Sequence, residues 1–387
     1  MSPLSDEVSI TSALPTTEDW KAPTVEPRSS PALRRLFRRR VGLVPTVIPY
    51  VSPHGWAYRP FLFLMRPEVL AIERSLCSQI CFVVARDNAC RFCYGSFRAF
   101  LRVTGYSEAE LDRLEQELHL RDHSGPDRDA LRFAVEISQG RLETGDRLRT
   151  LLEDGYSPTA IREVAGIAVV TALVNRVGTM LAVPVNTEAE HLTSQWYFDL
   201  LQPVVRSLLR GWQRFGAPAV DPLTAEEVDG PFAPWIRRLR GTCVGHVVHN
   251  ITTRWTEEQS ALSLRTKLLA LAVVARGLGA QSLEERARSV LSDRFGLPDD
   301  ALTTALKHLR GPAVEEPGGG LLRLARASTR YEATSIQRMV PEHTRELSRA
   351  ETIDTVATLG VCNALARLQA LAPLDRGSFV STSPPPA

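Results

Sequence analysis

Apolar residues recur along most of this 387-residue chain at the three- and four-residue spacing of amphipathic helices, and the alternation typical of β-strands is scarce. Two helix starts carry clear caps. Ser107 opens a capping box with Glu110, and Ser157 precedes a proline at the first helical position. The pattern predicts helices over 74–86, 89–104, 107–119, 127–139 and 158–181. The predicted fold class is therefore all-α.

An internal repeat divides the patterned part of the chain in two. The run Val-Val-Ala-Arg at 83–86 recurs at 273–276, an offset of 190 residues, and further matches downstream follow at offsets of 191 and 192. A drift by single residues in one direction is typical of a duplicated domain with short insertions. The predicted organisation is a first copy at 32–190, an amphipathic helix and linker at 191–230, and a second copy at 231–376.

The two ends of the chain differ in composition from this patterned region. Residues 1–31 are polar and rich in Ser, Thr and Pro, which predicts a disordered tail, and 377–387 form a Pro/Ser-rich tail. The whole chain is 44% hydrophobic and 23% charged, with a net charge of +2, as in a soluble globular protein. We expect no nucleic-acid or membrane partner and, with no signal peptide or long apolar span in view, a cytoplasmic location.

Four of the six cysteines lie between residues 77 and 93, and two of them form a Cys-x-x-Cys pair, Cys90 and Cys93. Asp87 and Asn88, just before the pair, are both good helix caps. We therefore expect a helix from about residue 89, with Cys90 in its first turn and Cys93 one turn further on.

The start of a helix is a favourable place for a thiolate. Unpaired backbone N–H groups and the positive end of the helix dipole lower the pKa of a thiol there, and Arg91 and Arg98 would add positive charge. The pattern predicts a reactive dithiol. Half of a zinc site and a pair of inert, buried thiols are the alternatives, although no second Cys or His pair at zinc-finger spacing follows.

Cys77 and Cys81 lie four residues apart on the preceding apolar helix and share one of its faces. If this helix packs beside the Cys-x-x-Cys helix, all four sulfurs approach one another. Such a cluster would bind a soft metal ion or store a second disulfide. Plain core packing is the other interpretation, because a free cysteine behaves as a small buried hydrophobe.

The stretch 83–105, in which an apolar helix leads into Cys-x-x-Cys and a glycine-terminated helix, resembles the carboxymuconolactone decarboxylase and alkylhydroperoxidase D-like family. The helical segments within 130–183, including Leu-Val-Asn-Arg at 173–176, are also similar to that family's later helices. The resemblance covers about 40–190 well and about 231–376 weakly. It implies a duplicated alkylhydroperoxidase D-like helical bundle whose second copy has lost the cysteine pair.

The resemblance also implies an activity. Subunits of this family self-associate and use a redox-active cysteine pair to reduce peroxides, without a cofactor or a metal ion. In the family pattern the second cysteine attacks the peroxide and the first resolves the sulfenic acid, roles that fall here on Cys93 and Cys90. A dithiol reductant or a thioredoxin-like protein would restore the pair, so we expect that partner and a homo-oligomer. The family's decarboxylase branch does not rely on Cys-x-x-Cys.

The chain departs from the family pattern at the residues that move protons. Phe97 stands where the family usually has a histidine, and Ser78 stands where it usually has a glutamate. Tyr94, Cys77 and Cys81 are further candidates to lie near the pair. Three hypotheses follow: a thiol redox enzyme, a non-catalytic binding or assembly protein on the same fold, and a four-cysteine metal site.

Overall fold

The computed structural model describes residues 13–52, 56–65, 67–117, 125–195, 197–214, 221–257, 261–311, 318–330 and 332–375. Every regular element in these ranges is a helix, so the predicted all-α class is confirmed. The predicted helices are present with small shifts at their ends, and the caps explain two of the starts. Ser107 forms its capping box with Glu110, and Ser157 accepts a hydrogen bond from the Ala160 N–H.

The first half of the chain contains α1 (Pro31–Arg40), α2 (Ile48–Val51), α3 (Arg59–Met65), α4 (Arg74–Asp87), α5 (Arg91–Thr104), α6 (Glu108–Glu117), α7 (Pro126–Ser138), α8 (Gly145–Glu153) and α9 (Pro158–Met180). Two helices follow it, α10 (Thr187–Ser194) and α11 (Phe198–Arg214). The second half contains α12 (Ala233–Ile236), the 3₁₀ helix η1 (Arg237–Leu239), α13 (Cys243–Thr256), α14 (Leu264–Leu278), α15 (Gln281–Phe295), α16 (Asp299–His308), α17 (Gly318–Ala327), α18 (Ala333–Thr344), α19 (Arg349–Arg367), the 3₁₀ helix η2 (Leu368–Leu371) and α20 (Ala372–Asp375).

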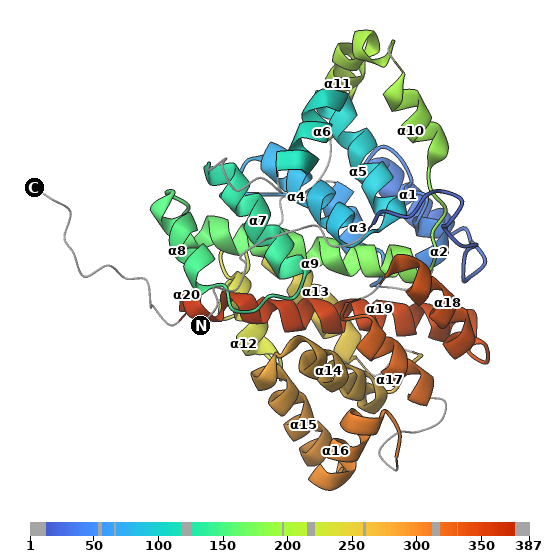
Figure 1. Ribbon diagram of the computed structural model, residues 1–387, viewed down its shortest axis with the longest axis vertical. Coiled ribbons are helices and arrows are strands. Elements are labelled where there is room, and N and C mark those ends of the chain that lie inside the picture. Colours follow the sequence, from blue (N-terminus) through green and yellow to red (C-terminus); the bar gives the residue numbers. More distant parts are fainter. Residues whose placement is uncertain are drawn as a thin grey trace, which may run out of the picture.

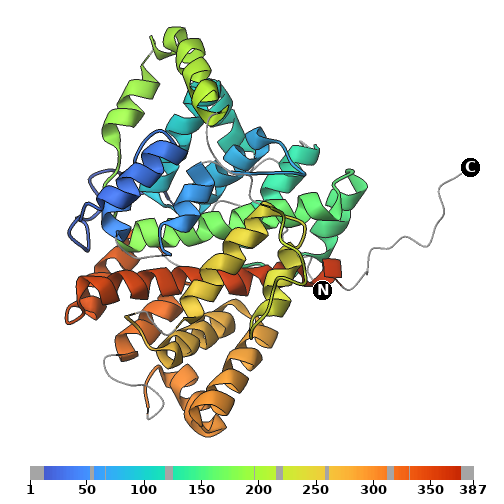
Figure 2. The ribbon, with the colours of Figure 1, turned by 180° about the vertical axis from the view of Figure 1, so that it is seen from behind.

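Two long helices, α9 and α19, lie side by side through the middle of the molecule (Figure 1). All residues of α9 from Ala160 to Met180 are buried, as are those of α19 from Thr352 to Arg367. Helices α4 and α7 pack on α9, whereas α14 and α17 pack on α19, and Figure 2 shows the same division from behind. The central pair therefore forms a core that both halves share.

The stretch Arg349–Asp375 is long and apolar enough to cross a membrane, but 94% of its most apolar window is buried inside the protein. A helix that is apolar on all sides is expected in the core of a large domain. The burial therefore fits a core helix of a folded domain.

Two arginines of the central helices hold the two halves of the chain together through buried polar contacts. Arg176 of α9 donates from Nε to the Ser328 carbonyl (3.0 Å), and Arg367 of α19 donates from Nε to the Ser138 carbonyl (3.0 Å). Both guanidinium groups also donate to the Thr329 carbonyl, at 3.3 and 3.2 Å. These buried bonds satisfy carbonyls at the ends of α7 and α17, and they tie each half to the other.

A carboxylate on each central helix also anchors a segment within its own half, just before α4 or α14. Glu163, which is fully buried, accepts hydrogen bonds from the N–H groups of residues 70–72 just before α4. Asp354 accepts one from the Leu262 N–H just before α14. The Glu163 contacts set where α4 begins, and α4 carries two of the cysteines and leads to the other two.

The N-terminal segment corrects one prediction. Trp20 is buried, and its indole N–H donates to the Val183 carbonyl at 2.9 Å. Thr24 donates its N–H to Leu181 and its hydroxyl to Met180, both at 3.0 Å. The prediction of a disordered tail is therefore wrong for residues 13–30, because buried apolar side chains and backbone bonds hold them against the end of α9. Residues 1–12 and 376–387, which include the predicted C-terminal tail, lie outside the described residues.

Candidate functional site

The turn between α4 and α5 places the cysteine pair. The Cys90 N–H donates to the Ala85 carbonyl at 3.1 Å, and Ala89 takes a left-handed conformation with φ of 48°. Cys90 is then the N-cap of α5, with its sulfur 3.4 Å from the backbone nitrogen of Cys93. The prediction of a helix starting at residue 89 after an Asp or Asn cap is wrong, because the left-handed turn delays the start to Arg91.

Both thiols are free and buried, with 0% of Cys90 and 1% of Cys93 exposed. They share one patch of α9. A Cβ atom added at Gly178 would lie 3.3 Å from Cys93 Sγ, 3.4 Å from Cys90 Sγ and 3.4 Å from a ring carbon of Phe92. Because Gly178 has no side chain, the two sulfurs and the Phe92 ring can pack directly against α9.

The electrostatics of Cys93 are opposite to the expectation from its place near a helix start. Burial raises the pKa of the Cys93 thiol well above its ordinary value, and its hydrogen bond with Cys90 and the negative charges that Cys90 and Cys81 would carry act in the same direction. The predicted lowering of this pKa is therefore wrong.

The two arginines expected to assist the thiolate are paired with carboxylates instead. Arg91 forms a two-bond ion pair with Glu190 of α10. Arg98 pairs with three acidic residues of α6: Glu108, Asp112 and Glu115. These ion pairs fasten neighbouring helices onto α5.

Cys93 reaches a cavity even though little of it is exposed. It lines a cavity of about 430 Å³ whose walls come from α1, α3, α5, α9, α10, α11 and the segment between α1 and α2. Arg40 is the only charged residue among the described residues of this wall. Ser96 and Thr193 donate their hydroxyls to carbonyls of their own helices, so the wall offers few unused polar groups.

Cys81 is close enough to Cys93 for its charge to act on that thiol. Thr171 of α9 donates its hydroxyl to Cys81 Sγ at 3.4 Å. A hydrogen bond with Cys81, followed by burial, raises the pKa of the Cys77 thiol well above its ordinary value. Across the ranges that the structure describes, no three His, Cys, Asp or Glu side chains converge as metal ligands, so the geometry does not favour the four-cysteine metal site.

The remaining candidates lie in different places. Ser78 donates its hydroxyl to the Arg74 carbonyl of its own helix. Tyr94 stacks on Phe82 and donates its hydroxyl to Glu115 at 2.6 Å, so it belongs to the contact between α5 and α6. Burial and that bond raise the pKa of Tyr94. Phe97 lines the cavity, so a phenyl ring stands where a histidine was expected.

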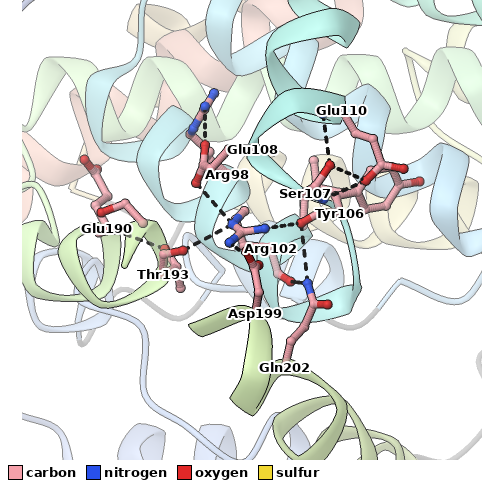
Figure 3. Close-up of polar contacts among 12 residues, drawn as sticks. Arg98, Arg102, Tyr106, Ser107, Glu108, Glu110, Glu190, Thr193, Asp199 and Gln202 are labelled. Atoms are coloured by element: carbon pink, nitrogen blue, oxygen red, sulfur yellow. Dashed lines mark hydrogen bonds and ion pairs between the residues drawn. The ribbon is translucent and has the colours of Figure 1, made fainter. Parts of the chain in front are cut away.

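The sequence did not indicate the far wall of the cavity, which α10 and α11 supply. Arg102 of α5 is 2% exposed and lies at the centre of the polar contacts that hold this wall (Figure 3). It donates to the Thr193 carbonyl at 3.1 Å and to the Asp199 carboxylate at 2.7 Å, and its own carbonyl accepts from Gln202 at 2.6 Å. The amphipathic pattern of 193–215 was a signal for this helix, but not for the surface that it covers.

The second half has the same turn without the thiols. Gly279 takes the left-handed conformation with φ of 73°, and the Ala280 N–H donates to the Ala275 carbonyl at 2.8 Å. Ala280 and Leu283, in the places of Cys90 and Cys93, are fully buried. Hydrocarbon thus fills the position that sulfur takes in the first half.

Comparison with known proteins leaves this geometry as the basis for assigning a function. No protein-family model matches the chain, and neither the curated proteins nor the solved structures include a match to it.

Proposed function

We propose that the protein is a thiol-dependent oxidoreductase in which Cys93 and Cys90 cycle between dithiol and disulfide. One observation carries the proposal. Cys93 lines an apolar cavity, and the Cys90 sulfur packs beside it at the start of α5 and against the same glycine of α9. Cys90 is not among the described residues of the cavity wall, which supports Cys93 as the attacking thiol and Cys90 as the resolving one.

The reaction needs both sulfurs. The Cys93 thiolate attacks the outer oxygen of a peroxide, the O–O bond breaks, and an alcohol or water leaves after taking up a proton, which gives a sulfenic acid. The Cys90 thiolate then attacks the Cys93 sulfur, so that the S–S bond forms, the S–O bond breaks, and hydroxide leaves and takes up a proton from solvent to become water. A dithiol reductant, which is itself oxidised to a disulfide, restores both thiols by exchange. A disulfide substrate would enter the same cycle through a mixed disulfide.

Peroxide consumption with dithiothreitol as reductant tests the proposal. We expect turnover by the wild type and none by Cys93→Ser. Cys90→Ser, mixed with peroxide in the absence of dithiothreitol, should consume about one equivalent and stop, with a dimedone-reactive sulfenic acid on Cys93. Cys362→Ser is the matched control, because Cys362 is a buried lone thiol of the second half and should leave turnover unchanged. A wild type that consumes neither peroxide nor disulfide, or full turnover by Cys93→Ser, would contradict the proposal.

A second candidate is a binding protein on the same fold, in which the dithiol no longer reacts. The raised pKa of Cys93 and the phenyl ring of Phe97 on the cavity wall favour it. The two candidates differ in the reactivity of Cys93 at neutral pH, which thiol labelling measures directly.

The wider proposal is that the chain is a duplicated, alkylhydroperoxidase D-like bundle that self-associates in the cytoplasm. The reciprocal bonds of Arg176 and Arg367 support the duplication, because two copies related by a twofold axis exchange equivalent contacts. The outward face of α11, on which Leu200 is 73% and Val204 59% exposed, supports self-association. A thioredoxin-like protein or a small dithiol is the proposed reductant.

A further inference from the structure

We propose that the cavity beside Cys93 is a binding site for a molecule with an uncharged aliphatic chain, and that α10 and α11 form its movable wall. The inference deepens the proposed function by naming the ligand class, and it rests on that function for the need to reach Cys93. Binding itself needs no thiol chemistry, so the two ideas can fail separately.

The size and lining of the cavity point to an apolar chain. A volume of about 430 Å³ lies within the range of about 300–1,000 Å³ typical of pockets that enclose a small organic molecule. Valine, leucine and phenylalanine side chains from five helices and from the segment between α1 and α2 make up more than half of the lining residues, and no carboxylate occurs among the described ones. A cationic or strongly polar ligand would lose its hydration there without gaining partners.

The wall made by α10 and α11 is held to α5 mainly by polar contacts at its edges. One is the ion pair of Arg91 with Glu190. This pair crosses α5 at Gly95, where a side chain would not fit, because an added Cβ would lie 1.6 Å from Glu190 Oε1. The other is the cluster around Arg102, in which the Asp199 side chain is 61% exposed. Thr193 is the only buried residue of α10, whereas α9 is buried from Ala160 to Met180. Separating this wall from α5 therefore exposes less apolar surface than separating the buried helices from one another.

The position of the wall links its movement to the thiol. Phe198 and Val205 of α11 and Ala189 of α10 face the same cavity as Cys93. Moving α10 and α11 away from α5 widens the cavity on that side, whereas α9 is buried along its length and stays in place. A chain that enters beneath this wall therefore arrives at the sulfur that lines the opposite side.

Fluorescence binding with N-phenyl-1-naphthylamine, displaced by a series of primary alcohols from hexanol to hexadecanol, tests the ligand class. We expect affinity to rise about fourfold with each methylene until the cavity is full, and then to level off. The series is measured without peroxide, so the thiols stay reduced and binding is separated from redox chemistry. Absence of displacement by any alcohol, or equal displacement by the corresponding alkylammonium ions, would overturn the proposal.

Filling the cavity provides the mutational test. Ala99 lines the cavity, so Ala99→Phe should weaken dodecanol binding at least tenfold. Ala109→Phe is the matched control, because Ala109 is exposed on α6 and outside the cavity wall. A circular dichroism melt of each variant keeps the result interpretable, since a filled cavity leaves the fold intact. Unchanged dodecanol binding by folded Ala99→Phe would place the ligand elsewhere and overturn the proposal.

Stopped-flow kinetics test the movable wall. Glu190→Gln weakens the ion pair that holds α10, so dodecanol should enter and leave faster than in the wild type, by a similar factor in both directions. Asp112→Asn is the matched control, since it removes an ion pair of Arg98 that joins α5 to α6. Equal rates in the two variants would show that α10 and α11 do not move when the ligand enters.

Discussion

The ionisation of Cys93 decides between a redox enzyme and a binding protein, and it can be measured in the intact chain. An ordinary thiol has a pKa of about 8.5, so roughly one-tenth of it is thiolate at pH 7.5. The Cys93 pKa lies well above its ordinary value because the sulfur is fully buried. Each unit of upward shift lowers the thiolate fraction about tenfold, so less than about one-tenth of Cys93 is ionised at that pH.

This reasoning is tested by the rate at which iodoacetamide labels Cys93, measured by mass spectrometry between pH 6 and 10. The rate should rise about tenfold per pH unit and reach no plateau below pH 9. Limited access slows labelling equally at every pH, so the slope reports ionisation alone. Cys90→Ala should label faster at a given pH, because Cys90 contributes to the raised pKa of Cys93.

Cys243 is the internal control for this experiment, because burial raises its pKa to about 11 and its labelling rate should keep rising up to pH 10. A plateau for Cys93 below pH 8, with a rate at pH 7 equal to that of glutathione, would refute the argument from burial. That result would mean that the helix start affects the pKa of Cys93 more than burial does, and it would favour the redox enzyme.

Three further predictions concern the framework around the site. Glu163→Gln should lower the free energy of unfolding by about 2–4 kcal/mol in a urea titration, because a charged acceptor of several backbone N–H groups is lost; an unchanged midpoint would contradict the anchoring role. Ala89→Gly should stabilise the protein by about 1 kcal/mol and Gly279→Ala should destabilise it by a similar amount, because both residues are left-handed; equal thermal melts would count against this. Burial lowers the pKa of Lys267 below its unfolded value of 10.5, so the unfolded chain binds more protons there and stability relative to Lys267→Met should increase as pH rises toward 10.5; a constant difference between the two proteins would exclude the shift.

Local rules predicted the helices because the signals that start and stop them lie within a few residues. The capping box at Ser107 and the cap and proline at Ser157 and Pro158 placed two starts within a residue of those observed. The same rules failed at the cysteine pair. A left-handed turn at an alanine carries no local signal, although Gly279 takes the same conformation just before α15.

The direction of the Cys93 pKa shift shows what local reasoning omits. A position near a helix start favours the thiolate, and the sequence alone predicts that position. Burial opposes it, and burial depends on Gly178 of α9, which lies 85 residues further along the chain. Tertiary packing also decides the partners of Arg91 and Arg98, which were expected to stabilise the thiolate. Arg91 pairs with Glu190 of α10, and Arg98 pairs with Glu115 of α6.

By itself, the sequence determined the all-α class, the positions of most helices and the pair of thiols, since periodicity, caps and residue type act over short range. The tertiary structure alone decided the surroundings of the thiols. It packed both sulfurs against one glycine, placed Cys93 on an apolar cavity and brought α10 and α11 across α5 as the far wall. The solvation of the thiols and the shape of the cavity depend on which distant segments of the chain pack together. No local sequence pattern specifies that packing.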